Sequence, residues 1–309
     1  MYFPYMRGKQ FELAALKEIS TRLTPSKVNP IIEPVNDSTD KLCGVIDTLN
    51  SNGITPHVIV NPEVGDLASD NPDALESDIS AHSVSFIPCI RLNNLNIQYA
   101  QNLLQRLVTE ETPFSLFLQE DIQSNITPYT SNAVANIIQN LNRYSHSFSN
   151  SLPKSVIITS SFPNKSRNAD YSRTPQFFSD AHNTFMTPLI TNQIGFGDFL
   201  TIDDAWSTGG GPAFVVALHI TYIDSGNKNM YVKHSLSTKN PNDQSDPAGK
   251  FQEALQEMIT FANTTPSLNQ NTLGFQEYLN IHARKKYHGL GVPKKLSMMH
   301  HIETINNYI

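Results

Sequence analysis

The stretch MYFPYMRGKQFELAALKEI, residues 1–19, contains the repeating unit from which the fold is predicted. Residues 2–6 are mostly aromatic or apolar, which is typical of a buried strand. After a short basic turn, residues 11–19 place apolar side chains at helical spacing. A secretory signal peptide has the opposite order, with its positive charge before a long apolar run. We therefore interpret residues 1–19 as a strand, a loop and a helix.

The same alternation continues along the chain. Apolar segments rich in β-branched or aromatic residues predict strands at 2–6, 29–35, 55–62, 85–92, 114–121, 155–161, 198–204 and 213–223. Amphipathic segments predict helices at 11–19, 40–50, 96–108, 131–144 and 249–262. Strands that alternate with helices favour right-handed crossovers and a mostly parallel sheet. Eight such units over about 260 residues match a (β/α)8 barrel of the TIM type.

An open, doubly wound sheet is the alternative fold, but the chain has no GxGxxG after the first strand and no Walker loop. We expect the barrel to occupy residues 1–263. A β-hairpin extends its eighth strand, with residues 230–236 as the second arm. Residues 264–309 are expected to form a linker and a C-terminal helical appendage that packs on the barrel.

Composition excludes several classes of protein. With 39% hydrophobic and 16% charged residues, the 309-residue chain can bury a substantial core. The net charge of −6 argues against nucleic-acid binding, which usually needs a basic surface, and only residues 282–295 are locally basic. No apolar run reaches the roughly 20 residues that cross a bilayer. Because no apolar run is long enough, we expect no membrane partner. Cys43 and Cys89 form no CxxC motif, so we expect a cytoplasmic protein.

Candidate site residues come from the ends of the expected strands, because the carboxyl ends of barrel strands form the functional face. Arg7, Lys9, Arg91 and Asn61 are the expected binding residues for an anionic small molecule. A guanidinium group offers an anion two donors in one plane.

The carboxylates and one histidine supply the expected chemistry. Glu33, Glu120 and Asp203 are predicted to act as acid and base, or to hold a divalent cation, and His219 to carry a proton. A structural network of ion pairs at the strand ends is the alternative interpretation.

Other motifs point to no specific chemistry. HExxH and GxSxG are absent, and the spacing of the histidines predicts no metal site. The glycines at 209–211 lack a diagnostic spacing and favour a plain loop or lid over a phosphate-binding loop. His57 lies within an expected strand, which favours a buried histidine with a hydrogen-bond partner. The sequence requires no cofactor.

The opening residues also carry a resemblance. The pattern consists of Tyr2, Pro4, Arg7, Gly8, Lys9, Glu12, Ala15 and Leu16, with NPIIEPV at 29–35, GFGDF at 195–199 and KHS at 233–235. It resembles the phage "beta protein" family and its bacterial relatives. The resemblance implies a mobile two-gene module with a small nuclease-like partner protein, and hence anti-phage defence or inter-phage conflict. It also adds weight to Arg7, Lys9, Glu12, Glu33 and Asp198, although a carboxylate at position 12 also suits a helix N-terminus.

Two hypotheses follow. The first is a barrel enzyme, hydrolase- or phosphodiesterase-like, that acts on an anionic, phosphate-containing substrate. The second is a non-catalytic scaffold or sensor that binds a protein partner such as the nuclease-like subunit. The sequence leaves open whether the protein is an enzyme.

Overall fold

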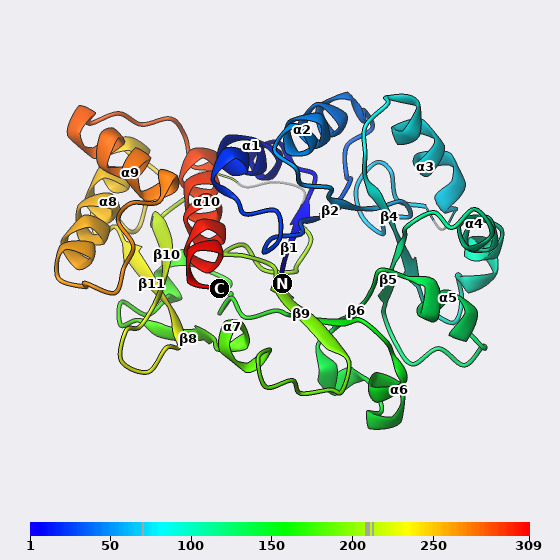
Figure 1. The fold of residues 1–309 in the computed structure, drawn as a ribbon. Helices are drawn as coiled ribbons and strands as arrows, with labels where there is room; N and C mark the ends of the chain where they lie inside the picture. Colours follow the sequence, from blue (N-terminus) through cyan, green and yellow to red (C-terminus); the bar gives the residue numbers. More distant parts are fainter. Residues whose placement is uncertain (70, 208–210, 212) are drawn as a thin grey trace. The chain divides into compact units, whose positions relative to one another are not determined.

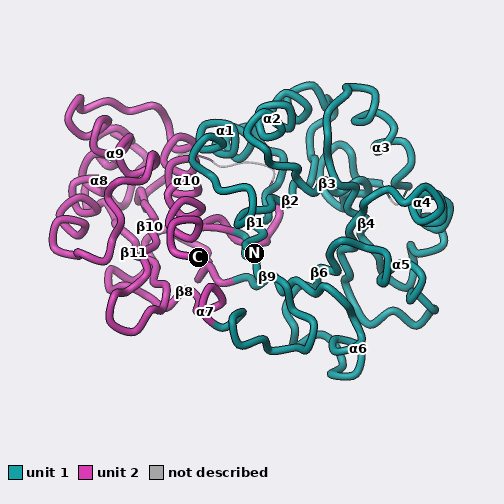
Figure 2. Tube along the Cα trace, in the orientation of Figure 1, with its two compact units in different colours: residues 1–160, 184–199 teal, residues 161–183, 200–309 magenta. Residues whose placement is uncertain are grey.

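The structure, a computed structural model, describes residues 1–69, 71–207, 211 and 213–309. They form two compact units, shown in Figure 2. The first contains residues 1–160 and 184–199, and the second contains residues 161–183 and 200–309. This division differs from the boundary after residue 263 that the sequence predicted. Residues 209 and 210 of the glycine run lie outside the described residues.

The first unit is a closed barrel of eight parallel strands, which confirms the predicted (β/α)8 fold (Figure 1). In barrel order the strands are β1 (Tyr2–Arg7), β2 (Ile31–Glu33), β3 (His57–Ile59), β4 (Ile87–Leu92), β5 (Ser115–Leu118), β6 (Ala135–Gln139), β7 (Ser155–Thr159) and β9 (Gln193–Asp198). Its helices are α1 (Gln10–Ile19), α2 (Asp40–Ser51), α3 (Pro72–Ala81), α4 (Ile97–Thr109), α5 (Thr127–Asn132) and α6 (His146–Ser151).

Two of the last three barrel strands, β6 and β9, differ from the sequence-based assignment, whereas β7 lies within the predicted strand 155–161. The segment 131–144, predicted as a helix, contains β6, where Ile137 and Ile138 are both fully buried. A parallel strand is covered on both faces, so its consecutive apolar residues imitate part of a helical pattern. The eighth barrel strand is β9, and the predicted strand 198–204 begins where β9 ends.

The barrel interior explains why β9 was missed. Its core includes Phe3, Ile59 and Phe117. A Cβ atom on Gly195 would lie 2.6 Å from the ring of Phe3, and one on Gly197 would lie 2.2 Å from the Phe3 carbonyl oxygen. These glycines admit the first strand and its aromatic side chain, at the cost of the apolar alternation that marks a strand.

His57 is a buried core residue, as predicted. Its Nδ1 lies 2.9 Å from Ser115 Oγ within the barrel. Burial lowers the pKa of His57 to about 4, so the ring is neutral near pH 7.

The second unit contains an antiparallel sheet in the order β10-β11-β8. Its elements are β8 (Gln176–Ser179), β10 (Ala217–Ile223), β11 (Met230–Leu236), α8 (Pro247–Asn263), α9 (Leu273–Arg284) and α10 (Gly291–Tyr308), and α7 (Ala181–Thr184) spans the boundary between the units. The predicted hairpin is therefore confirmed as a β10–β11 pair, but β10 is not a barrel strand.

The C-terminal helices are integral to the second unit. Ser297 of α10 donates a hydrogen bond from Oγ to the carbonyl oxygen of His219 at 2.6 Å. His300 of the same helix lies 2.7 Å through Nε2 from the carbonyl oxygen of Thr221. Through these contacts α10 closes the core over β10. None of the described helices is both long and apolar enough to cross a membrane.

The close approach at β9 gives a stability prediction. We expect Gly197→Ala to lower the free energy of unfolding by about 1–3 kcal/mol, because the new Cβ atom collides with a backbone atom that has little room to move. Gly44→Ala in α2 is the matched control, since its Cβ atom would meet nothing within 4 Å. The control should be neutral or stabilising by up to about 1 kcal/mol. Urea unfolding measures both, and equal midpoints for Gly197→Ala and the wild type would contradict this packing.

Candidate functional site

A buried carboxylate, Glu33, is the centre of a polar cluster at the carboxyl ends of the barrel strands. Its Oε1 accepts hydrogen bonds from Arg91 Nη2 at 2.9 Å and from the backbone N–H of Glu63 at 3.2 Å. Its Oε2 accepts one from the Tyr5 hydroxyl at 2.6 Å and lies 3.5 Å from Arg7 Nε. Only 1% of Glu33 is exposed, and both of its carboxylate oxygens are engaged.

Arg91 of β4 is the main partner of this carboxylate. Its Nη2 also donates to the Tyr5 hydroxyl at 2.6 Å, and its Nη1 donates to Glu63 Oε2 at 3.3 Å. The guanidinium carbon lies 4.6 Å from the centroid of the Phe117 ring, in a cation–π contact. Burial alone would lower the pKa of Arg91, but Tyr5, Glu33 and Glu63 outweigh it and raise that pKa.

Two further groups fix the cluster. Asn61 holds the backbone of Arg91 on both sides: it accepts from the Arg91 N–H and donates to the Arg91 carbonyl oxygen, each at 2.8 Å. Burial raises the pKa of Tyr5 well above its usual value, so the phenol stays protonated and donates. Arg7, Glu33, Asn61 and Arg91, which the sequence predicted to meet, therefore do lie together.

Sequence reasoning missed Tyr5 and Glu63, although each lies two residues from a predicted site residue. Alternate residues of a strand share one face, and Tyr5 is two residues before Arg7 on β1. Glu63 is two residues after Asn61. The Glu63 side chain is 46% exposed, accepts from Arg91 and also accepts from Gln119 Nε2. The cluster thus extends from a buried floor at Tyr5 to an exposed rim at Glu63.

A cavity of about 310 Å³ adjoins this cluster, where the β1–α1 and β2–α2 loops meet. Its polar lining includes Lys9, Gln10, Asn36, Ser38, Lys41 and the carboxylate Asp37. Lys9 is the N-cap residue of α1 and Thr39 that of α2, and neither side chain makes a capping hydrogen bond. The first-turn N–H groups of a helix carry partial positive charge. Lys9 thus belongs to this cavity, and the cavity favours an anion.

Glu12 is a second buried carboxyl group near these residues. Its place in the first turn of α1 agrees with the sequence, but only 5% of it is exposed. Burial raises the pKa of Glu12 to about 8; Lys9 and Arg7 oppose the increase, and Glu33 adds to it. A helix-dipole role does not require such burial, so sequence reasoning gave Glu12 too little weight.

Glu120 makes different contacts from those of the cluster. It follows β5, is exposed, and accepts a hydrogen bond through Oε1 from the backbone N–H of Asn94 at 2.8 Å. Glu120 thereby connects the end of β5 to the loop after β4.

Asp203 and His219 lie in the second unit, which corrects the expectation that they end barrel strands. Asp203 Oδ2 accepts from Asn164 Nδ2 at 2.6 Å, and the Tyr171 hydroxyl donates to Asn164 Oδ1 at 3.4 Å. The Tyr171 ring centroid lies 4.8 Å from that of His219 and 4.5 Å from that of His234.

The two histidines face each other across the β10–β11 pair. Their Nδ1 atoms are 2.7 Å apart. Burial lowers the pKa of His219 well below its usual range and the pKa of His234 to about 4. Neighbouring positive groups are a second, smaller cause of both decreases. Both rings are therefore neutral near pH 7, and they form a polar cluster of the second unit.

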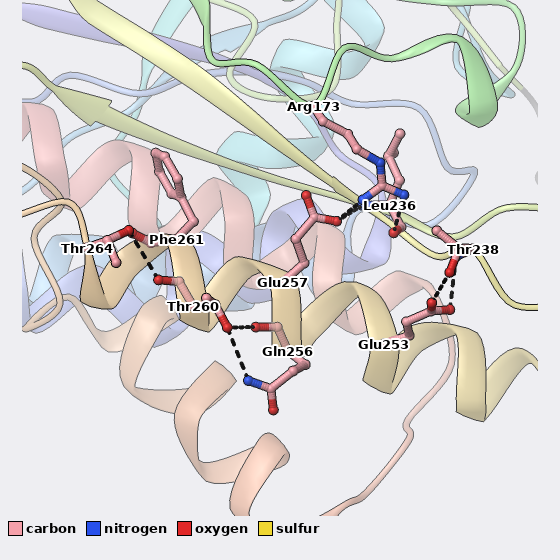
Figure 3. Close-up of a pocket in the computed structure, with 9 residues that line it drawn as sticks. All are labelled: Arg173, Leu236, Thr238, Glu253, Gln256, Glu257, Thr260, Phe261 and Thr264. Atoms are coloured by element: carbon pink, nitrogen blue, oxygen red, sulfur yellow. Dashed lines mark hydrogen bonds and ion pairs between the residues drawn. The ribbon is translucent and has the colours of Figure 1, made fainter.

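A groove of about 460 Å³ lies beside α8 in the second unit (Figure 3). Arg173 and Glu257 point toward each other there and form an ion pair. Arg173 Nη2 donates to the Leu236 carbonyl oxygen at 3.0 Å, and Glu257 Oε2 accepts from the Leu236 N–H at 3.1 Å. These bonds pair the backbone of Leu236, which lies beyond the part of β11 that pairs with β8. No predicted site residue lies in the groove.

The described part of the chain contains no group of three or more His, Cys, Asp or Glu side chains placed to hold a metal ion. No protein-family model, no curated protein and no solved structure matches the chain.

The pairing of Glu33 with Arg91 gives a second prediction. We expect Arg91→Met to lower the free energy of unfolding by about 3–5 kcal/mol, because it leaves a buried carboxylate without its main partner. The double variant Arg91→Met/Glu33→Gln should recover a substantial part of that loss. Denaturant unfolding of the two single variants and the double variant measures the coupling, and additive losses would contradict the ion pair as described.

The burial of Glu12 gives a third prediction. Its pKa rises from 4.5 in the unfolded chain to about 8 in the folded protein, so the folded state binds the proton more tightly. Stability should therefore fall as pH rises between these values, by about 3 kcal/mol at neutral pH. Glu12→Gln lacks this loss, so it should unfold like the wild type near the acid end and be more stable at neutral pH. Unfolding curves across pH test this, and parallel curves for the two proteins would contradict it.

Proposed function

We propose that the barrel binds a phosphate-containing anion at its carboxyl edge and acts on it as a hydrolase- or phosphodiesterase-like enzyme. The observation that carries this proposal is the position of the cationic cavity beside the Glu33 cluster. Gly8 and Pro34 line the cavity, and they directly follow Arg7 and Glu33 of the cluster. The Gly8 N–H also donates to the Glu33 carbonyl oxygen at 2.6 Å.

The anion would bind between Lys9 and Lys41, with the first-turn N–H groups of α1 and α2 as further donors. The Arg7 side chain is 12% exposed and lies 3.5 Å through Nε from Glu33 Oε2, and the next residue, Gly8, lines the cavity. Arg91 is engaged with Tyr5, Glu33 and Glu63, so it orients the two carboxylates and does not bind the anion. This differs from the anion-binding role expected for Arg91 from the sequence.

The acid–base work is assigned to the carboxylates of the cluster. Glu63 reaches the exposed rim, and Arg91 and Gln119 hold its two oxygens, which orients it toward solvent. Glu33 is the buried partner that keeps Arg91 in place. A carboxylate in such a position can accept a proton from water or from a substrate hydroxyl. A divalent cation would have to compete with Arg91 for both carboxylates.

Membership of a defence or conflict module is part of the proposal, and it is supported by the resemblance of the opening residues to the phage beta protein family. The alternative is a scaffold or sensor that binds a nuclease-like protein. The pairing of both Glu33 oxygens favours this alternative, because a network with a purely structural role would show the same pairing.

Sulfate and pyrophosphate binding, measured by isothermal titration calorimetry, tests the anion site. We expect Lys9→Gln and Lys41→Gln each to weaken binding by about 10-fold or more, since each removes a charge-assisted contact. Lys17→Gln is the matched control, because Lys17 is exposed in the last turn of α1. Equal affinities for all three variants would refute the site.

Phage protection in cells that carry the gene and its neighbours tests the enzymatic part. Glu63→Gln should abolish protection while the protein stays folded, and Glu110→Gln at the exposed C-cap of α4 should keep it. Loss of protection in Asp203→Asn would show that protection also requires the second unit. Under the scaffold alternative, Glu63→Gln retains protection and a neighbouring gene's product co-purifies with the protein.

A further inference from the structure

We propose that Glu12 is a working part of the anion site and carries a proton when an anion binds, so that anion binding and proton uptake are coupled. This inference rests on the proposed function, because it concerns the same cavity. It adds a group that lies outside the Glu33 cluster and for which the sequence also offered a helix N-terminal role.

The Glu12 carboxyl group is buried and incompletely hydrogen-bonded. Glu12 is 5% exposed, and its Oε2 has no hydrogen-bond partner among the residues that the structure describes. Glu33 shows what a buried structural carboxylate looks like in the same unit, with both oxygens engaged. A buried, ionised oxygen without a donor is costly, so the structure favours a protonated Glu12.

Glu12 is buried beside the cavity without lining it. Its neighbours at the start of α1, Lys9, Gln10 and Leu13, all line the cavity. The charged groups that act on Glu12 are Lys9 at the start of α1, Arg7 at the end of β1 and Glu33 at the end of β2. A backbone hydrogen bond from Arg7 also reaches it. Glu12 thus shares its cationic neighbours with the proposed anion.

The coupling follows from that sharing. An ionised Glu12 attracts Lys9 and Arg7 and repels an anion, whereas a protonated Glu12 leaves both cations to the anion. An anion therefore binds best to the protonated form and raises the proton affinity of Glu12. The affinity for an anion should fall as pH rises past about 8, the pKa of Glu12 without an anion.

Sulfate is the probe for the test because it stays a dianion between about pH 6 and about pH 9, so any proton exchanged on binding comes from the protein. Titration calorimetry in two buffers with different ionisation enthalpies gives the affinity and the number of protons taken up. We expect the wild type to take up protons near pH 8 and to lose about 10-fold in affinity across this range. Glu12→Gln should bind sulfate with little proton uptake and a nearly flat pH profile.

Glu18→Gln is the matched control, since it makes the same change of charge on the exposed face of the same helix and should behave like the wild type. If Glu12→Gln keeps the wild-type proton uptake, the inference about Glu12 is overturned while the anion site stands. If the wild type binds no sulfate at any pH, the proposed site and this inference both fail.

A second measurement needs no variant. Carbon-13 NMR of the wild type with labelled glutamate should show one carboxyl group that titrates near pH 8 and moves to higher pH when sulfate is added. A carboxyl titration that sulfate leaves unchanged would also overturn the inference.

Discussion

The ion pair between Glu33 and Arg91 is the interaction on which the polar end of the barrel depends. It connects β2 to β4, and Tyr5 and Arg7 bring β1 into the same network. A buried carboxylate and a buried guanidinium are each costly alone, so their geometry has to satisfy nearly every donor and acceptor. That requirement fixes the positions of the surrounding groups, including Asn61 and the rim carboxylate Glu63.

The apolar layer below this network makes it possible. Tyr5, Ile31, Ile59, Cys89 and Phe117 point into the barrel, and a polar residue follows two positions later on the same face in each of these five segments. These polar residues are Arg7, Glu33, Asn61, Arg91 and Gln119. The pleat therefore stacks one polar layer on one apolar layer, and the glycines of β9 complete the apolar layer around Phe3.

The site joins two kinds of polar environment. Glu33 and Arg91 are paired with each other and keep a fixed geometry, which suits a structural or orienting role. Lys9, Lys41 and the uncapped starts of α1 and α2 border an open cavity, which suits an anion. Glu12 shares Lys9 with the cavity and Arg7 and Glu33 with the paired groups. A substrate that bound only to the paired groups would have to break their hydrogen bonds and ion pairs. The cavity can bind an anion without that cost.

Local pattern by itself determined the fold class and one part of the site. Apolar strands that alternate with amphipathic helices predict a parallel barrel, and the carboxyl ends of parallel strands meet, so Arg7, Glu33, Asn61 and Arg91 were placed together correctly. Local pattern failed for β6 and β9, since a strand buried on both faces or opened by glycines loses its alternation.

Only the tertiary structure decided which residues are buried and which unit they join. The burial of Glu12 depends on chain segments distant in sequence, and so does the placement of Asp203 and His219 in the second unit. The spacing of residues along the chain indicates the period of a helix or a strand. It does not indicate which distant segment buries a given carboxyl group.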